Sequence, residues 1–191
     1  MSDALPPGVF VRHNLLPPLA FARVLAALDR LSASWARSED LGLVGRNHTR
    51  QVRGGDLAAQ GPLDEIRAIV APAALAANRA AGFAFPRPPH LQLFPVLMDG
   101  DRSAPPRQEP HVDSSPTQPA PPTCANVFYA RARGVEGGAL ALARERAGGG
   151  LADPIRVTPQ PNTLVSFIGD WVHWVEPLTA GERLSIVVNF Y

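Results

Sequence analysis

The spacing of apolar residues divides the chain into a helical first part and a strand-rich remainder. Between residues 19 and 31, apolar side chains recur every three or four positions, which predicts an amphipathic helix with prolines at its start. Residues 63–81 predict a second helix, although Pro72 should kink or split it. A short apolar run at residues 8–12 predicts a strand that precedes the first helix.

After residue 90, short apolar runs alternate with turns rich in glycine and proline, a pattern that favours a sandwich or barrel. Helices followed by strands indicate an α+β, mainly β protein: a double-stranded β-helix (jelly-roll) with N-terminal helices packed on one sheet. We expect a single domain over 1–191, with 1–82 as helical support and 90–191 as the jelly-roll core. The predicted strands of this core are residues 90–98, 125–130, 139–143, 154–157, 164–168 and 184–191.

Composition and charge narrow the classes of function. The net charge of +1 argues against a nucleic-acid-binding protein. All 18 basic residues are arginines, which excludes a Schiff-base lysine and a phosphate loop of the Gly-Lys-Ser/Thr type. Cys124 is the only cysteine, which excludes a multi-cysteine metal site and fits a reducing compartment. Without a signal-peptide pattern or a long apolar run, we expect a cytoplasmic protein that does not enter a membrane.

The candidate chemistry starts at His111-Val112-Asp113, between two polar, proline-rich segments, 99–110 and 114–122, that indicate loops. On a strand, alternate residues point to the same face, so His111 and Asp113 would lie side by side. A nitrogen and an oxygen ligand in this arrangement form half of a metal site. Alone, the tripeptide is a weak signal, because a surface histidine next to a turn-forming aspartate has the same pattern.

The C-terminal segment supplies the other candidates. Residues 164–191 predict two strands joined by a turn at 176–181, which would place His173 and Arg183 opposite each other on neighbouring strands. A packed histidine and a solvated arginine are the alternatives for these two positions. By period two, one face of the last strand carries Arg183, Ser185, Val187 and Asn189, and the other carries Leu184, Ile186 and Val188.

This order of residues resembles the iron(II)/2-oxoglutarate-dependent oxygenases, and within them the prolyl 4-hydroxylase-like branch. The resemblance rests on His-x-Asp, a histidine about 60 residues later, and Arg-x-Ser ten residues after that. Three further segments support it: residues 10–16 before the first helix, the EGG step within 135–140, and the GERLS sequence at 181–185. It covers nearly the whole chain, from about residue 8 to 191.

The resemblance implies that His111, Asp113 and His173 bind Fe(II), and that Arg183 and Ser185 bind the far carboxylate of 2-oxoglutarate. It implies an enzyme that uses O2 to hydroxylate an unactivated C–H bond, with release of succinate and CO2 and with ascorbate as a stimulant. An amino acid, a natural-product intermediate or a peptidyl, including prolyl, group is the implied substrate. Asp113 argues against halogenation, because related halogenases lack this carboxylate.

One departure concerns the strand before His111. Many members of the family have a tyrosine there that contacts the co-substrate, whereas residues 91–96 contain none. Two other functions stay open: a non-enzymatic, cupin-like jelly-roll binding module and a zinc-dependent hydrolase. Arg183 favours the oxygenase, because neither alternative needs a cation ten residues after the last metal ligand.

A separate basic segment, residues 46–53, is a candidate for substrate contact. If this segment is extended, Arg46, His48 and Arg50 share a face that could receive an anionic group, and a solvated charged face is the alternative. The expected partner is a small-molecule or peptide substrate, with no nucleic acid and no membrane. The sequence does not predict the substrate's identity or the oligomeric state.

Overall fold

Two antiparallel sheets form the body of the computed structural model, which describes residues 5–31, 35–37, 43–44, 49–52, 57–85, 89–113 and 120–191. The helices within these ranges are α1 (Pro18–Arg30) and α2 (Leu57–Ala80). The strands are β1 (Val9–His13), β2 (Trp35–Arg37), β3 (Leu43–Val44), β4 (Thr49–Val52), β5 (Leu91–Asp99), β6 (Arg107–His111), β7 (Cys124–Gly137), β8 (Leu140–Ala143), β9 (Ile155–Val157), β10 (Thr163–Ile168), β11 (Val172–Val175) and β12 (Leu178–Phe190).

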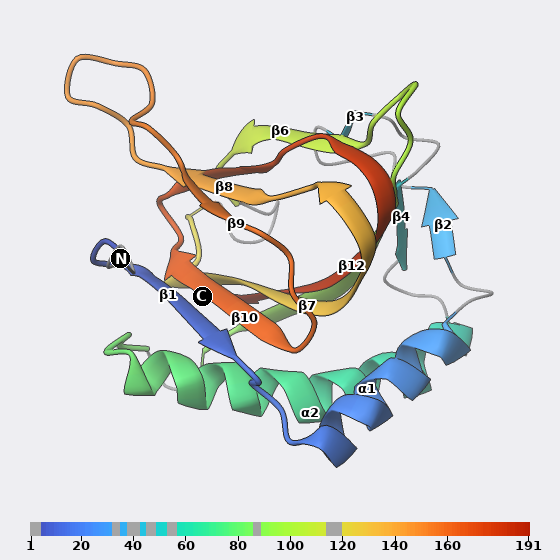
Figure 1. Cartoon of the computed structure of the whole chain (residues 1–191). Helices are drawn as coiled ribbons and strands as arrows, with labels where there is room; N and C mark the ends of the chain where they lie inside the picture. The colour runs from blue at the N-terminus through green and yellow to red at the C-terminus, as the bar shows by residue number, and fades with distance from the viewer. Residues whose placement is uncertain are drawn as a thin grey trace.

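The larger sheet has the strand order β1-β10-β7-β12-β5-β4-β2, and the smaller one has the order β3-β6-β11-β8-β9. From β7 onward, the chain changes sheet between β7 and β8, β9 and β10, β10 and β11, and β11 and β12. Figure 1 shows the two sheets facing each other across the interior. This arrangement confirms the predicted mainly-β jelly-roll architecture.

Both helices cover the outer side of the larger sheet, as Figure 1 shows. The alternation predicted for the last strand explains this packing, because its apolar side chains face the helices while its polar side chains face the interior. The central contacts of this core join Val24 and Leu28 of α1, Ile66 and Val70 of α2, and Leu184, Ile186 and Val188 of β12.

The prediction for the second helix needs a correction. α2 begins at Leu57, earlier than expected, and runs unbroken through Pro62 and Pro72, so Pro72 does not split it. A proline inside a helix costs about 3 kcal/mol. Packing on the sheet outweighs this cost, since Ile66 and Val70, which lie between the two prolines, are fully buried. Among the described residues, neither helix has the length and apolar character needed to cross a membrane.

The predicted hairpin at residues 176–181 is wrong. The strand with His173 pairs with β6 and β8 in the smaller sheet, whereas β12 pairs with β5 and β7 in the larger one. Pro177 lies in the two-residue connection, where a missing amide hydrogen does no harm to either ladder. His173 and Arg183 therefore face the interior from opposite sheets instead of lying on neighbouring strands.

The expected loop at 99–110 also needs a correction, because its last four residues belong to β6. Arg107 and Glu109 are exposed on this strand, so it lacks the apolar alternation that identifies a half-buried strand. Of the other expected loop, 114–122, residues 114–119 lie outside the described part of the chain.

Gly181 sets the position of the strand that carries Arg183. Its φ of +81° lies in the left-handed region, and a Cβ there would lie 2.3 Å from the carbonyl oxygens of Arg133 and Gly134. Only glycine tolerates both conditions. The register of β12 against β7 shifts on either side of Ala180, so this glycine allows an irregularity just before the functional part of the strand.

Candidate functional site

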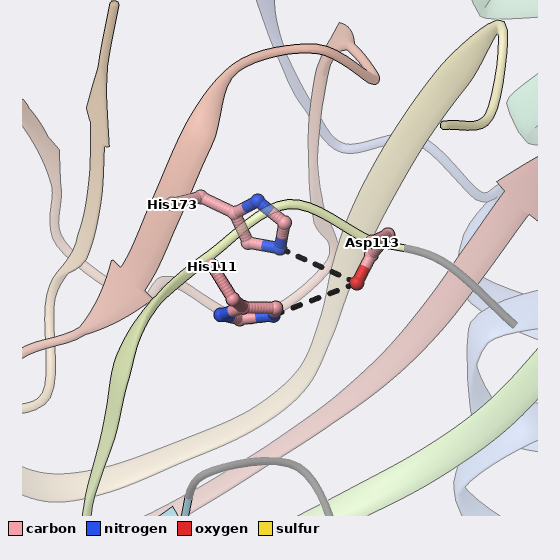
Figure 2. Close-up of side chains that lie close together, drawn as sticks. All are labelled: His111, Asp113 and His173. Atoms are coloured by element: carbon pink, nitrogen blue, oxygen red, sulfur yellow. Dashed lines mark ion pairs between the residues drawn. The ribbon is translucent and has the colours of Figure 1, made fainter. Parts of the chain in front are cut away.

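Two histidines and one aspartate converge between the sheets. His111 ends β6 and is the direct cross-strand partner of His173 on β11, with ring centroids 4.2 Å apart. Asp113 follows β6 by two residues, and its Oδ1 lies 3.5 Å from His111 Nε2 and 3.6 Å from His173 Nε2. Figure 2 shows both rings directed at this oxygen. One ligand atom from each residue lies within 4.8 Å of the other two, close enough to share one metal ion.

Backbone carbonyls fix the orientation of both rings. His111 Nδ1 lies 2.9 Å from the Glu109 carbonyl oxygen, and His173 Nδ1 lies 3.2 Å from that of Trp171. A ring N–H that donates to a carbonyl leaves the other nitrogen with its lone pair free for a metal. Each Nε2 faces Asp113, so a metal there takes the place of the proton that the ring otherwise donates to this carboxylate.

The electrostatics of the cluster favour charge despite burial. Burial opposes the charged form of Asp113, yet hydrogen bonds from His111 and His173 keep the pKa of its carboxyl far below the usual range. Burial also opposes charge on His111, but its hydrogen bonds to Asp113 and to the Glu109 carbonyl raise the pKa of the ring. A carboxylate that stays ionised in a largely buried place is suited to holding a cation.

Asn189 holds the second oxygen of this carboxylate. Its Nδ2 donates to Asp113 Oδ2 at 2.9 Å, and the side chain is buried on the inner face of β12. The sequence placed Asn189 on this face without assigning it a partner. Because Oδ2 is occupied, Oδ1 is the oxygen left to face the two histidines.

Replacing Asn189 with leucine is expected to weaken Mn²⁺ binding about 10- to 100-fold, the usual effect of losing a partner of a metal ligand. The reason is that Asp113 would lose the bond that orients it. Titration calorimetry measures the affinity. Gln92→Leu is the matched control, because Gln92 contacts Asn189 but not Asp113. Equal Mn²⁺ affinity in Asn189→Leu and wild type would contradict this role.

Arg183 is a buried cation without an acidic partner in the described part of the chain. Its exposure is 2%, its Nη1 donates to Ser185 Oγ at 3.2 Å, and its Nε has no hydrogen-bond partner. The guanidinium also lies over the ring of Tyr129, 5.1 Å from its centroid. A buried charge without a counter-ion is costly, so the geometry favours an anionic ligand here.

Tyr129 packs against Arg183 next to the pocket, and the sequence analysis missed it. Its hydroxyl is fully buried beside Arg183 and has no partner. Burial raises the pKa of this phenol, although Arg183 acts against that shift, so the group is a neutral donor. The strand before His111 lacks a tyrosine, as expected; this one comes from β7, where it pairs with Ser185. The alternation of residues 125, 127 and 129 along the predicted strand was the sequence signal that could have placed Tyr129 on its inward face.

All five predicted site residues line one pocket between the sheets, with an empty volume of about 590 Å³ including its open mouth. Apart from these residues, the lining is mainly apolar: Phe94, Val96 and Met98 of β5, Val127 of β7, Leu140 of β8, Phe167 of β10, Val175 of β11 and Val187 of β12. A narrow apolar pocket excludes water and strengthens the polar contacts inside it.

Half of the basic segment 46–53 falls outside the described residues. Residues 45–48 and 53–56 are not described, and of Arg50 only the backbone is, as a member of β4 paired with Leu97. The proposed contact of this segment with an anionic substrate therefore stays a prediction.

Comparison with models of protein families and with curated proteins finds no match. Solved structures do match. A prolyl 4-hydroxylase from Pseudomonas putida is 20% identical with a TM-score of 0.63, and the match covers 96% of this chain and 91% of that one. A Trichoplax adhaerens prolyl hydroxylase, in complex with a peptide of the hypoxia inducible factor oxygen degradation domain, is 15% identical with a TM-score of 0.67 (coverage 96% and 83%).

A third match is an oxidoreductase of the 2OG-Fe(II) oxygenase family from Burkholderia pseudomallei, which is 16% identical with a TM-score of 0.67 and coverage of 96% and 84%. These likenesses extend over almost the whole chain at low identity. They show that the chain has the fold of the 2-oxoglutarate and iron(II) oxygenases, which confirms the fold that the sequence resemblance implied.

Proposed function

We propose that the protein is an iron(II)- and 2-oxoglutarate-dependent oxygenase that hydroxylates an unactivated C–H bond and releases succinate and CO2. One observation carries the proposal: His111, Asp113 and His173 converge in the same pocket as the unpaired guanidinium of Arg183. The fold shared with known oxygenases supports it.

The donor set fits iron(II). Two imidazole nitrogens and one carboxylate oxygen on one face of an octahedral ion leave three positions open for a 2-oxo acid and O2. When bound, the iron supplies the oxidative chemistry, which the protein itself does not perform. His111, Asp113 and His173 hold the ion, and Asn189 keeps Asp113 in place.

Arg183 binds the far carboxylate of 2-oxoglutarate in this proposal. Its planar fork matches a carboxylate, and such charge-assisted bonds are strong in a dry pocket. Tyr129 and Ser185 lie beside the guanidinium and have hydroxyl groups that can donate to the same anion. The anion would provide an acceptor for Arg183 Nε and for the Tyr129 hydroxyl, which have no hydrogen-bond partner within the described residues.

The substrate proposed is an amino acid, a natural-product intermediate or a peptidyl group, prolyl included. The Trichoplax adhaerens neighbour holds a peptide, which supports a peptide or small-molecule substrate. The apolar walls of the pocket suit an uncharged reacting group. Ascorbate would serve as a stimulant. A zinc hydrolase or a cupin-like binding module would leave the buried Arg183 unexplained.

Adding Fe(II) and 2-oxoglutarate to the protein without oxygen should produce a weak visible charge-transfer band. In air, a screen of free amino acids and prolyl peptides should identify compounds that stimulate succinate release. Zn²⁺ in place of Fe²⁺ is the control and should give neither signal, because zinc has no redox chemistry. Absence of the band in the Fe(II) sample would overturn the proposal.

A further inference from the structure

A cluster of buried polar side chains between α2 and the larger sheet has no task in the proposed function. Asn78 of α2, Asn126 of β7 and Ser166 of β10 form it, and each is at most 1% exposed. Asn126 is at its centre, since its Oδ1 accepts hydrogen bonds from Asn78 Nδ2 and Ser166 Oγ, each at 2.7 Å. A buried network in which such a residue has all its partners makes the surrounding structure rigid.

The other end of the Asn126 side chain holds β12. Its Nδ2 donates to the Val188 carbonyl oxygen at 2.7 Å. Within the described residues, the ladder between β7 and β12 skips Val188 and Asn189, which have no opposite residue on β7. The side-chain amide therefore fixes β12 to β7 at the place where the backbone ladder is interrupted.

This interruption lies next to a residue that supports the metal centre. Asn189 directly follows Val188, and its Nδ2 donates to Asp113 Oδ2 at 2.9 Å. On its other side, β12 pairs with β5 without a break at these two residues, so that side of the strand does not depend on Asn126. Hydrogen bonds weaken as distance and angle depart from their optimum, so a small displacement of β12 here would loosen the contact with Asp113.

We propose that Asn126 is a positioning residue of the metal centre, an inference that rests on the proposed function. It fixes the Val188 carbonyl and so the position of Asn189, which in turn orients Asp113. The orientation of the Asn126 amide is determined by its partners. A backbone carbonyl can only accept, so the amide nitrogen must face β12 while its oxygen faces Asn78 and Ser166.

The test compares the Mn²⁺ affinity of two variants by calorimetry. Asn126→Leu should weaken Mn²⁺ binding about tenfold, the lower end of the usual effect of losing a partner of a metal ligand, because the Val188 carbonyl loses its donor. Asn78→Leu is the matched control, since it removes an amide from the same cluster but leaves the bond to Val188, and its Mn²⁺ affinity should equal that of wild type.

Thermal unfolding shows whether each variant is folded. If Asn126→Leu does not fold, the double variant Asn78→Leu/Asn126→Leu takes its place, because removing both amides leaves fewer buried groups without a partner. The double variant should show the same tenfold loss of Mn²⁺ affinity relative to Asn78→Leu.

A double-mutant cycle with Asn189→Leu separates positioning from a general structural effect. Once Asn189 is leucine, Asn126→Leu should not weaken Mn²⁺ binding further, because the link to Asp113 is already absent. Three results would each overturn the inference and leave the proposed function intact: wild-type affinity in Asn126→Leu, an equal loss in Asn78→Leu, or the same loss with and without Asn189. A wild-type protein that does not bind Mn²⁺ would overturn both.

Discussion

Replacing Asp113 with alanine is expected to abolish succinate release and to weaken Mn²⁺ binding by more than about 100-fold. This effect exceeds the usual loss when only a residue that hydrogen-bonds to a metal ligand is removed. The change removes the one carboxylate of the cluster, which lies within 3.6 Å of both histidine Nε2 atoms. It leaves two imidazoles, which cannot fix an octahedral ion on one face. Calorimetry with Mn²⁺ and a succinate assay measure the two effects.

Glu109→Gln is the matched control for Asp113→Ala. Glu109 lies on β6, two residues before His111 and four before Asp113. Its carboxylate is exposed and pairs with Arg107. This variant removes one negative charge from the same segment and keeps the backbone carbonyl that orients His111. It should retain wild-type metal affinity and turnover. Turnover by Asp113→Ala at the level of this control would contradict the assignment of the metal centre.

Replacing Arg183 with methionine should have opposite effects on binding and on stability. The loss of a bidentate, charge-assisted contact should weaken 2-oxoglutarate binding about 100-fold or more. The metal-free protein should become more stable, because the change removes a buried cation that has no acidic partner among the described residues. Each kcal/mol gained would raise Tm by about 2–4 °C. Calorimetry and thermal unfolding give the two values.

Arg131→Met provides the comparison. Arg131 is also largely buried, but it pairs with Asp29 of α1 and lies 3.9 Å from Glu182. Removing this arginine leaves acidic groups without their partner, so Tm should fall while 2-oxoglutarate affinity stays the same. A lower Tm in Arg183→Met, together with unchanged 2-oxoglutarate binding, would show that Arg183 is a structural residue.

The sequence predicted helices and strands best where buried side chains recur at regular intervals. The first helix and the alternation along β12 follow directly from apolar spacing, since one face of each packs into the core. β6 escaped detection because its side chains are polar or exposed. Its place in the sheet comes from pairing with β11, a contact between residues more than 60 positions apart, and such pairing leaves no local pattern.

The candidate site was predicted in composition but not in geometry. Asp113 lies beyond the end of β6, so the same-face argument for His111 and Asp113 does not apply as stated. Proximity in sequence favoured a hairpin between His173 and Arg183, whereas the chain changes sheet there. Tyr129 was not singled out because its contact with Arg183 depends on how β7 pairs with β12, a property of the whole fold.

The alternation of β12 ties the chemistry of the protein to its folding. Leu184, Ile186 and Val188 anchor the strand under the helices, while Arg183 and Ser185, one peptide unit away, face the pocket. A core substitution that tilts this strand would also displace Arg183 and Ser185. Engineering for new substrates should therefore leave β12 intact and introduce diversity at pocket residues of other strands, for example at Phe94 of β5.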